Sequence, residues 1–151
     1  MKRCLFPGSF DPFTKGHEAI VDQALEVFDE VYIGIGVNSK KTGLFSLSQK
    51  INHIGTIYKD NSRVFVSSYE HLSVVFCNEI NATHIVRGLR DVKDFEYERS
   101  IRHMNHAISK IETVFFISDP KNSAVNSSII RELYQNGADI TQFVTRPELL
   151  V

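Results

Sequence analysis

Short apolar runs rich in β-branched residues alternate along this chain of 151 residues with longer segments whose apolar residues recur at helical spacing. This alternation constrains the fold more than any other feature, because strands joined through helices pair in parallel and bury both faces of their sheet. We therefore predict an α/β fold, a single doubly wound domain over residues 1–151, with a five-stranded parallel sheet and helices on both faces. The strands are expected at residues 3–6, 30–37, 63–67, 84–87 and 113–118.

Five helical segments and one final turn complete this pattern. The first helix is expected to begin near His17, and Ser46 with Gln49 predicts a capping box before the second. Thr145 and Glu148 predict a capped last turn. Each helix carries an apolar stripe, and in chain order the stripes are Ile20, Val21, Ala24, Leu25 and Phe28; Ile51, Ile54 and Ile57; Leu72, Val75, Phe76 and Ile80; Tyr97, Ile101, Met104 and Ile108; and Ile129, Ile130, Leu133 and Tyr134.

The charges nearly cancel, with 17 Lys and Arg against 18 Asp and Glu and a net charge of -1. Such a balance gives no general attraction to nucleic acid or to a membrane surface, so we expect neither as a partner, and any anion site must be local. Cys4 and Cys77 lie in separate apolar segments without metal-ligand spacing, which indicates reduced core cysteines. With no signal-peptide core and no apolar run of about 18 residues, we expect a cytoplasmic protein.

The first candidate site is the loop after the first strand, which reads PGSFDPFTKGH over residues 7–17. A glycine-containing loop that leads into a helix presents backbone amides and the positive end of the helix dipole, which together receive phosphate. Gly16 allows a close approach of the chain, and His17 can reach a phosphoryl oxygen from the first helical turn. A turn followed by a half-exposed histidine would explain the same residues.

Basic residues follow the second and the fourth strands. Lys40 and Lys41 lie after the second strand, and Arg87 and Arg90 lie where the fourth strand gives way to a helix. Such groups pair with phosphate oxygens, and the planar fork of arginine does so through two parallel hydrogen bonds. The alternatives are solvated lysines for the first pair and, for the second, structural ion pairs with the acidic residues of segment 94–98.

The last candidate is the segment NSAVNSS, residues 122–128, directly before the fifth helix. Hydroxyl groups and free amides at a helix N-terminus can cradle phosphate. Plain N-capping by Asn126 or a serine would explain the segment equally well. All four candidates follow strands of one parallel sheet, whose carboxyl ends share an edge, so we expect them to converge on one ligand.

Residues 9–17 resemble the T/HxGH motif of the nucleotidyltransferase superfamily, with Thr14 where several members carry a first histidine. Class I aminoacyl-tRNA synthetases have similar motifs, but they require a much longer chain and a KMSKS-like loop. The four segments together resemble the bacterial phosphopantetheine adenylyltransferase family over nearly the whole chain. The most specific match is RGLRDVKDFEYE at 87–98 with that family's RGLRxxxDFEYE signature, and PGSFDP at 7–12 and HMN at 103–105 agree.

The resemblance implies a Rossmann-like fold and a role for each matching residue. His17, Lys41 and Arg90 would be catalytic, the first two at the transferring phosphoryl group and its nucleophile. The residues that would bind phosphopantetheine are Ser9, Lys41, Ser73 and Arg87. Those that would bind ATP are Ser9, Phe10, His17, Gly88, Leu89, Arg90, Glu98, Asn122, Ser123, Ala124, Val125, Asn126, Ser127 and Ser128. Among them, Asn126 replaces a serine that is usual in the family.

The implied reaction is reversible transfer of AMP from ATP to 4'-phosphopantetheine, which gives dephospho-coenzyme A and pyrophosphate. Mg²⁺ is expected with the triphosphate, and no carboxylate cluster indicates a permanent metal site. The resemblance also implies a homo-oligomer, a hexamer. If the chain is an enzyme, the alternative is nucleotidyl transfer to another phosphate acceptor. Examples are the enzymes that act on nicotinamide mononucleotide and the CTP-dependent enzymes that act on glycerol phosphate. An inactive nucleotide-binding module and a pure assembly protein remain as the other classes.

Overall fold

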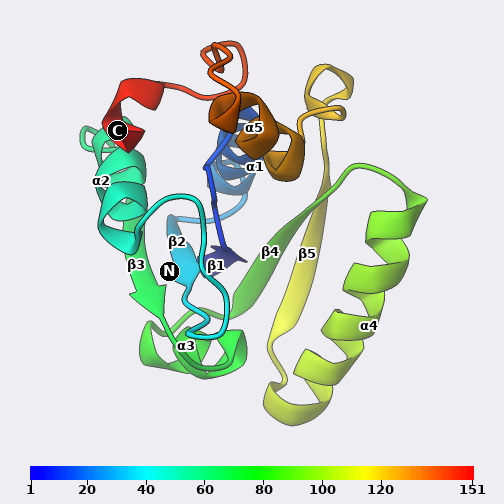
Figure 1. Ribbon diagram of the computed structural model, residues 1–151. Helices are drawn as coiled ribbons and strands as arrows, with labels where there is room; N and C mark the ends of the chain where they lie inside the picture. Colours follow the sequence, from blue (N-terminus) through cyan, green and yellow to red (C-terminus); the bar gives the residue numbers. More distant parts are fainter.

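The predicted five-stranded parallel sheet is present in the computed structural model, which describes residues 1–151 (Figure 1). Helices connect successive strands, as the alternating sequence patterns predicted. The elements are, in chain order, β1 (Arg3–Gly8), α1 (Lys15–Leu25), β2 (Glu30–Gly36), α2 (Leu47–Ile57), β3 (Val64–Tyr69), α3 (Ser73–Glu79), β4 (His84–Leu89), α4 (Val92–Ser109), β5 (Glu112–Ile117), the 3₁₀ turn η1 (Pro120–Asn122), α5 (Ser127–Gln135) and the 3₁₀ turn η2 (Pro147–Leu150).

The strand order is β3-β2-β1-β4-β5, and every neighbouring pair is parallel. The chain moves outward from β1 to β3 and then crosses back to β4, so the direction of winding reverses between β1 and β4. In an open α/β sheet, ligands bind outside the carboxyl ends of the strands at this reversal. Both flanking strands extend two residues beyond their predicted ends, to Gly8 and Leu89, because the ladders with β2 and β5 continue that far.

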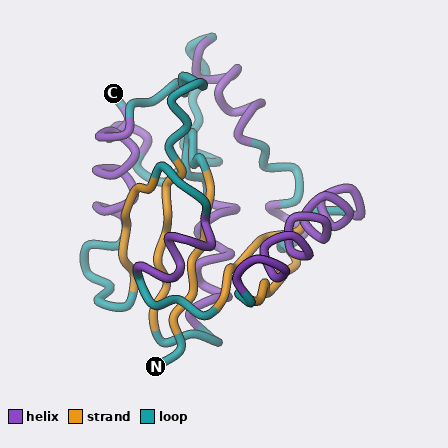
Figure 2. The backbone as a smooth tube through the Cα atoms, turned by 90° about the horizontal axis from the view of Figure 1, so that it is seen from below, coloured by secondary structure: helices purple, strands orange, loops and turns teal.

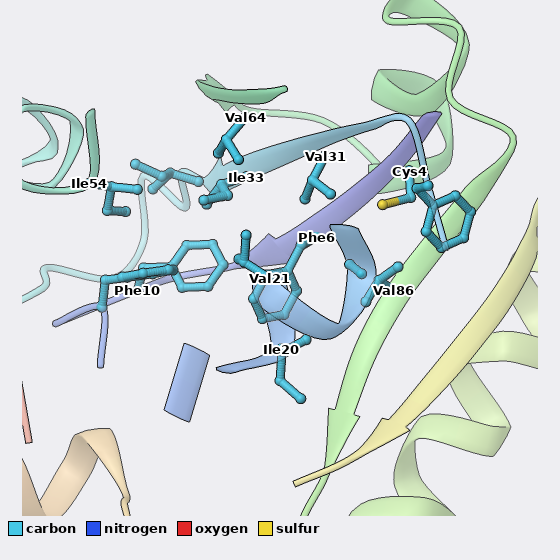
Figure 3. Close-up of a cluster of buried hydrophobic side chains, with 14 residues drawn as sticks. Cys4, Phe6, Phe10, Ile20, Val21, Val31, Ile33, Ile54, Val64 and Val86 are labelled. Atoms are coloured by element: carbon cyan, nitrogen blue, oxygen red, sulfur yellow. The ribbon is translucent and has the colours of Figure 1, made fainter. Parts of the chain in front are cut away.

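Alternate residues of the central strand enter separate cores on the two faces of the sheet. Cys4 and Phe6 pack with α1 and α2, in a cluster that includes Ile20, Val21 and Ile54 (Figure 3). Leu5, between them in the sequence, packs on the opposite face with residues of α3. The period of two along a strand produces this division, which the tube view shows as helices on either side of the strands (Figure 2).

The two cysteines are free and fully buried, which confirms their prediction as reduced core residues. Cys4 lies in the core beneath α1 and α2, and Cys77 lies in the core beneath α3. Burial raises the pKa of both thiols to about 12. Because the thiolate is the reactive form of cysteine, both side chains are chemically inert at neutral pH.

The helix ends confirm one predicted cap and correct another. Ser46 and Gln49 form the predicted capping box of α2. Thr145 does not cap the last turn, because its hydroxyl donates to a carboxylate oxygen of Glu18 at 2.6 Å. The residue that precedes this turn is instead Arg146, in the left-handed conformation at φ 52°. The hydrogen bond to Glu18, which is distant in the sequence, therefore takes the Thr145 hydroxyl away from the predicted cap.

Helix α4 lies at the outer edge of the molecule beside β5 (Figures 1 and 2). Three of the four residues in its apolar stripe are largely exposed, namely Tyr97, Met104 and Ile108, at 67%, 72% and 66%. The helix instead turns Glu98 inward, and its buried carboxylate reaches a residue of β4. None of the helices is long and apolar enough to cross a membrane.

Two glycines in this fold should respond to alanine in opposite directions. A Cβ on Gly34 in β2 would lie 2.6 Å from Leu5 Cδ1, so Gly34→Ala should lower the free energy of unfolding by about 1–3 kcal/mol. Gly55 in α2 has no atom within 4 Å of such a Cβ, and Gly55→Ala should raise it by about 0.5–1 kcal/mol. Urea unfolding of both variants measures the difference, and equal effects would contradict the packing described here.

Candidate active site

Three adjoining cavities lie at the carboxyl ends of the strands and meet at Ser9. The central cavity, of about 420 Å³, lies between β1, β4 and the N-termini of α1 and α5. The side pocket, of about 230 Å³, lies beside α4. The loop cleft, of about 1110 Å³, lies along segment 36–50. Ser9 is the one residue that lines all three, so a molecule in any of them can be brought to the same point.

The structure brings most of the predicted site residues to these cavities. Those that line the central cavity are Ser9, Phe10, His17, Arg87, Gly88, Arg90, Glu98, Asn122, Val125, Asn126, Ser127 and Ser128. Ser73 lines the side pocket with Arg87, and Lys41 lines the loop cleft. Leu89, Ser123 and Ala124 line none of the three. The four candidate segments therefore converge, as expected from the shared edge, but around adjoining spaces rather than a single one.

His17 is held in one orientation by a capping box at the start of α1. Its Nδ1 accepts a hydrogen bond from the Thr14 backbone amide at 2.9 Å, and its own amide donates to the Thr14 hydroxyl at 3.3 Å. The ring stacks on Phe13 at 5.3 Å and meets the edge of Phe10 at 5.1 Å. Since Nδ1 is an acceptor, the neutral ring carries its proton on Nε2, and this N–H is left for a ligand in the central cavity.

The environment of His17 also keeps the ring uncharged. Burial lowers its pKa to about 4, and the positive charges of Arg87 and Arg90 act in the same direction. At neutral pH, the side chain is therefore a hydrogen-bond donor and not a cation. Such a donor, fixed before the ligand arrives, can stabilise charge that develops on a phosphoryl oxygen without moving a proton.

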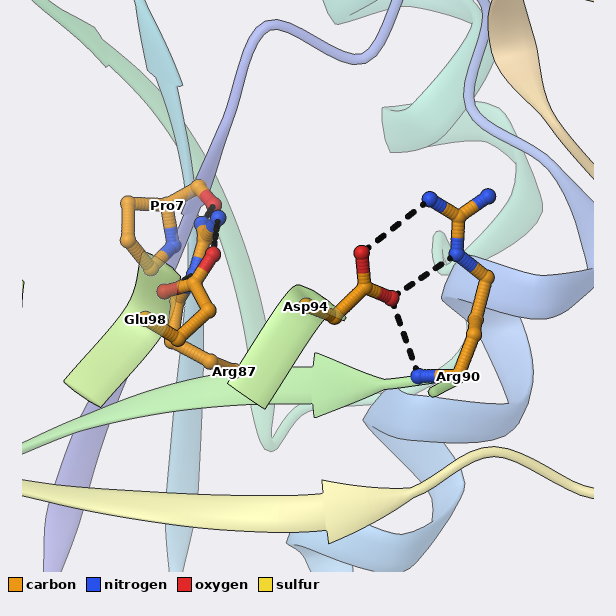
Figure 4. A network of polar contacts seen from close by, with 5 residues as sticks. All are labelled: Pro7, Arg87, Arg90, Asp94 and Glu98. Atoms are coloured by element: carbon orange, nitrogen blue, oxygen red, sulfur yellow. Dashed lines mark hydrogen bonds and ion pairs between the residues drawn. The ribbon is translucent and has the colours of Figure 1, made fainter. Parts of the chain in front are cut away.

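Both arginines of the RGLR segment form the ion pairs that the sequence left open as an alternative (Figure 4). Arg87 donates to both carboxylate oxygens of Glu98, at 2.6 and 2.9 Å, and to the Pro7 carbonyl at 2.6 Å. Arg90 donates through Nε to Asp94 at 3.1 Å. Burial alone would raise the pKa of Asp94, but hydrogen bonds from Arg90 and its charge outweigh burial and lower it. These pairs hold the arginines in place and offset much of their charge.

At the start of α5, plain N-capping also occurs. The side chain of Asn126 accepts from the amides of Ser128 and Ile129, at 2.8 and 3.4 Å. The Ser127 hydroxyl donates to the Pro12 carbonyl at 3.3 Å. The asparagine thus uses two amides that we had expected to be free for phosphate, and it ties the helix end into a fixed position beside the central cavity.

Asp11 and Arg131 were missed by the sequence reasoning. The buried carboxylate of Asp11 accepts the backbone amides of Leu44 and Phe45, at 2.8 and 2.9 Å, and so fixes the end of the loop that carries Lys41. Arg131 lies on α5 and lines both the central cavity and the loop cleft. No local pattern marks Asp11, whereas the position of Arg131, three residues after Ser128, places it on the same helix face and could have indicated it.

The site is rich in donors and offers few free acceptors. In the central cavity, Asp94 and Glu98 are both occupied by arginines. Lys41 is exposed in its loop, and its ammonium makes no ion pair or hydrogen bond within the protein. An open cleft lined by arginines, hydroxyls and a fixed histidine N–H is suited to a polyanion such as a nucleoside triphosphate.

Comparisons with known proteins agree with this chemistry. Residues 5–133 match the family model described as cytidylyltransferase-like. The chain is 44% identical over 144 residues to phosphopantetheine adenylyltransferase of Bacteroides thetaiotaomicron, covering 95% of both chains. It is also 44% identical over 147 residues to phosphopantetheine adenylyltransferase of Leuconostoc mesenteroides, covering 97% of this chain and 91% of that one.

Among solved structures, the chain is similar to a bifunctional NMN adenylyltransferase/ADP ribose pyrophosphatase from Francisella tularensis. The TM-score is 0.67 for its complex with AMP and a Mn ion, and 0.73 for a second structure of that protein. Sequence identity is 19%, and the match covers 97% of this chain but only 46% of that one. At this identity the likeness confirms the fold, an α/β nucleotidyltransferase fold with a parallel sheet.

The lowered pKa of His17 predicts a specific dependence of stability on pH. Asn at this position can still accept from the Thr14 amide but cannot titrate. As the pH falls from about 6.5 to about 4, the unfolded wild type gains a proton on His17 before the folded state does. Urea unfolding should therefore show the stability of the wild type falling relative to His17→Asn across this window, by at most about 3 kcal/mol. A constant difference between the two proteins would contradict the neutral ring.

Proposed function

The chain belongs to the phosphopantetheine adenylyltransferase family of cytidylyltransferase-like enzymes, and on this premise we propose that it transfers an adenylyl group from ATP to 4'-phosphopantetheine. The products are dephospho-coenzyme A and pyrophosphate, and the reaction is a step of coenzyme A biosynthesis. The observation that supports this function best is the junction at Ser9, where a donor-rich cavity for a polyanion adjoins a pocket for a second substrate.

The reaction needs no general base. An oxygen of the acceptor phosphate, already anionic at neutral pH, attacks the α-phosphorus of ATP. The new bond joins that oxygen to phosphorus, while the bond to the β-phosphate bridging oxygen breaks and its electrons leave with pyrophosphate. Catalysis then depends on the orientation of two anions and on the stabilisation of charge at the α-phosphoryl oxygens and the leaving group. The central cavity supplies fixed donors for this purpose.

We place the triphosphate in the central cavity. The Nε2–H of His17 faces the α-phosphoryl group, and Arg90 with Ser127 and Ser128 faces the β and γ phosphates. Glu98 acts through Arg87, because its carboxylate accepts two of the arginine N–H groups. We propose that it positions Arg87 in addition to the contact with ATP that the resemblance implied, since it also lines the central cavity.

We place the pantetheine arm in the side pocket. This pocket is lined by Ser73 and by apolar side chains such as Ile85 and Ile101, which suit an uncharged chain. Arg87 forms the wall that the side pocket shares with the central cavity. Lys41, across the junction at Ser9, would bind the acceptor phosphate, because its ammonium is unpaired. The arm would then point its phosphate at the α-phosphorus.

The metal ion belongs to the nucleotide in this proposal. Both carboxylates of the central cavity are bound by arginines, so the protein offers no free carboxylate there to hold Mg²⁺. Mg²⁺ would therefore be carried by the triphosphate, as part of the substrate. There it would supply charge neutralisation on the pyrophosphate leaving group. We also propose that residues 1–151 act as one nucleotidyltransferase domain, and the cytoplasmic location stays a prediction.

Pyrophosphate release by the purified protein tests the reaction. Release should occur with ATP, Mg²⁺ and 4'-phosphopantetheine, but not when nicotinamide mononucleotide replaces the acceptor or when CTP with glycerol phosphate replaces both substrates. His17→Ala should lower kcat by about 100-fold, since one fixed donor at a developing charge has this effect. Turnover with another acceptor only would overturn the proposed substrate, and normal turnover by His17→Ala would overturn the proposed role of the histidine.

Self-association is the second part of the proposal, and the exposed stripe of α4 supports it. Tyr97, Met104 and Ile108 present an apolar face to solvent, which indicates a contact surface between copies of the chain. A hexamer would have about six times the mass of the 17.2 kDa chain. The surface that these residues form on α4 is the one that we expect to be buried in the assembly.

Light scattering with size-exclusion chromatography tests this surface. Met104→Glu should dissociate the assembly, because an unpaired charge would be buried in the contact. Val27→Glu is the matched control, since Val27 is also an exposed apolar residue, at 52%, but lies outside α4. It should leave the mass unchanged. A monomeric wild type, or an intact assembly in Met104→Glu, would contradict the proposed contact.

A further inference from the structure

Arg131 occupies the boundary between two of the cavities. It lies on α5, and with Ser9 it is one of the two residues that line both the central cavity and the loop cleft. In the proposed function, the nucleotide lies on one side of this boundary and the phosphate bound by Lys41 lies on the other. A side chain at this place therefore faces both anions at the point where they must meet.

The guanidinium of Arg131 differs from the other two in the central cavity by having no carboxylate partner. Arg87 is paired with Glu98, and Arg90 with Asp94, whereas Arg131 forms no ion pair. Its full positive charge is therefore available at the boundary.

Two hydrogen bonds fix the position of this charge. Nη1 donates to the Asp11 carbonyl at 2.7 Å, and Nη2 donates to the Ser128 hydroxyl at 3.0 Å. These bonds use two of the five N–H donors of an arginine, which leaves three for a ligand. The Asp11 carboxylate in turn holds the amides of Leu44 and Phe45, so Arg131 is anchored to the same loop that carries Lys41.

We propose that Arg131 is a further catalytic residue, which binds phosphate oxygens of ATP and of the acceptor together and so lets the two anions approach. The proposal rests on the proposed function, and it concerns a residue to which neither the sequence motifs nor the family resemblance gave a role. Arg131 moves no proton and forms no covalent bond. Its charge offsets the repulsion between the acceptor phosphate and the α-phosphate while the new oxygen–phosphorus bond forms.

The repulsion between the two anions can be measured directly. Affinity for 4'-phosphopantetheine is determined by calorimetry in the absence and in the presence of saturating α,β-methylene-ATP with Mg²⁺, which cannot react at the α,β bridge. In the wild type, the nucleotide analogue should change the acceptor affinity little. In Arg131→Gln, each ligand alone should bind somewhat more weakly, because it loses one charged donor, and the analogue should weaken acceptor binding by about a further tenfold or more. Arg131→Lys should fall between the two, because it keeps the charge without the fork.

Kinetics provide a second readout. Arg131→Gln should lower kcat by about 100-fold and raise the KM for ATP by a smaller factor, as expected for a group whose main effect is at the point where charge develops. Arg63→Gln is the matched control, because Arg63 donates to the backbone carbonyls of Leu25, Phe28 and Asp29 and lines none of the three cavities. It should lower thermal stability and leave both kcat and the coupling between the ligands unchanged.

The results of these two experiments distinguish a failure of the role of Arg131 from a failure of the proposed function. If the wild type does not use 4'-phosphopantetheine, the proposed function is wrong, and the role of Arg131 is overturned with it. If the wild type is active but Arg131→Gln retains its kcat and its coupling, only the role of Arg131 is overturned. If Arg131→Gln loses stability to the same extent as Arg63→Gln with unchanged coupling, the residue is structural and the proposal is again overturned.

Discussion

The parallel pairing of β1 with both β2 and β4 is the constraint on which the rest of the structure depends. It places the first strand in the middle of the sheet, with its carboxyl end at the reversal of winding. Segments 120 residues apart in sequence, such as the loop that holds Asp11 and the helix α5 that holds Arg131, meet at this edge and bond to one another. Without the pairing, none of the donors of the site would share a cavity.

The charged groups of the site are concentrated locally, although the chain as a whole is nearly neutral. Glu98 and Asp94 each hold an arginine in place, so two guanidinium groups are fixed before a ligand arrives, at the expense of part of their charge. Arg87 and Arg90 in turn help burial to keep His17 neutral, because a second positive charge beside them is disfavoured. The result is a set of oriented donors in which Arg131 and Lys41 retain unpaired charge.

The helices differ in how much of their apolar surface is packed against the sheet. Helices α1 and α2 pack against one face of the sheet, and α3 packs against the other through Val74, Phe76 and Cys77. The predicted stripes are buried only in part, because Leu72 and Val75 of the third stripe and Ile51 of the second are exposed. Helix α4 turns a carboxylate inward to reach Arg87 and leaves much of its apolar stripe in solvent. The helix that helps to build the site is thus also the one that offers a surface to another copy of the chain.

The sequence by itself determined the order of the elements, the parallel sheet and the segments that would carry the chemistry, because hydrophobic period and turn residues are local properties. It left open whether Arg87 and Arg90 were free or paired, and it gave no indication of Asp11. Only the tertiary structure decided these points. Except for Arg90, whose partner Asp94 is four residues away, the partners lie in other elements: Glu98 of α4 for Arg87, and Leu44 and Phe45 of the loop after β2 for Asp11. The bond from Thr145 to Glu18 of α1 is of the same kind. Hydrogen bonds between distant segments depend on how the sheet aligns its strands, so no local pattern can specify them.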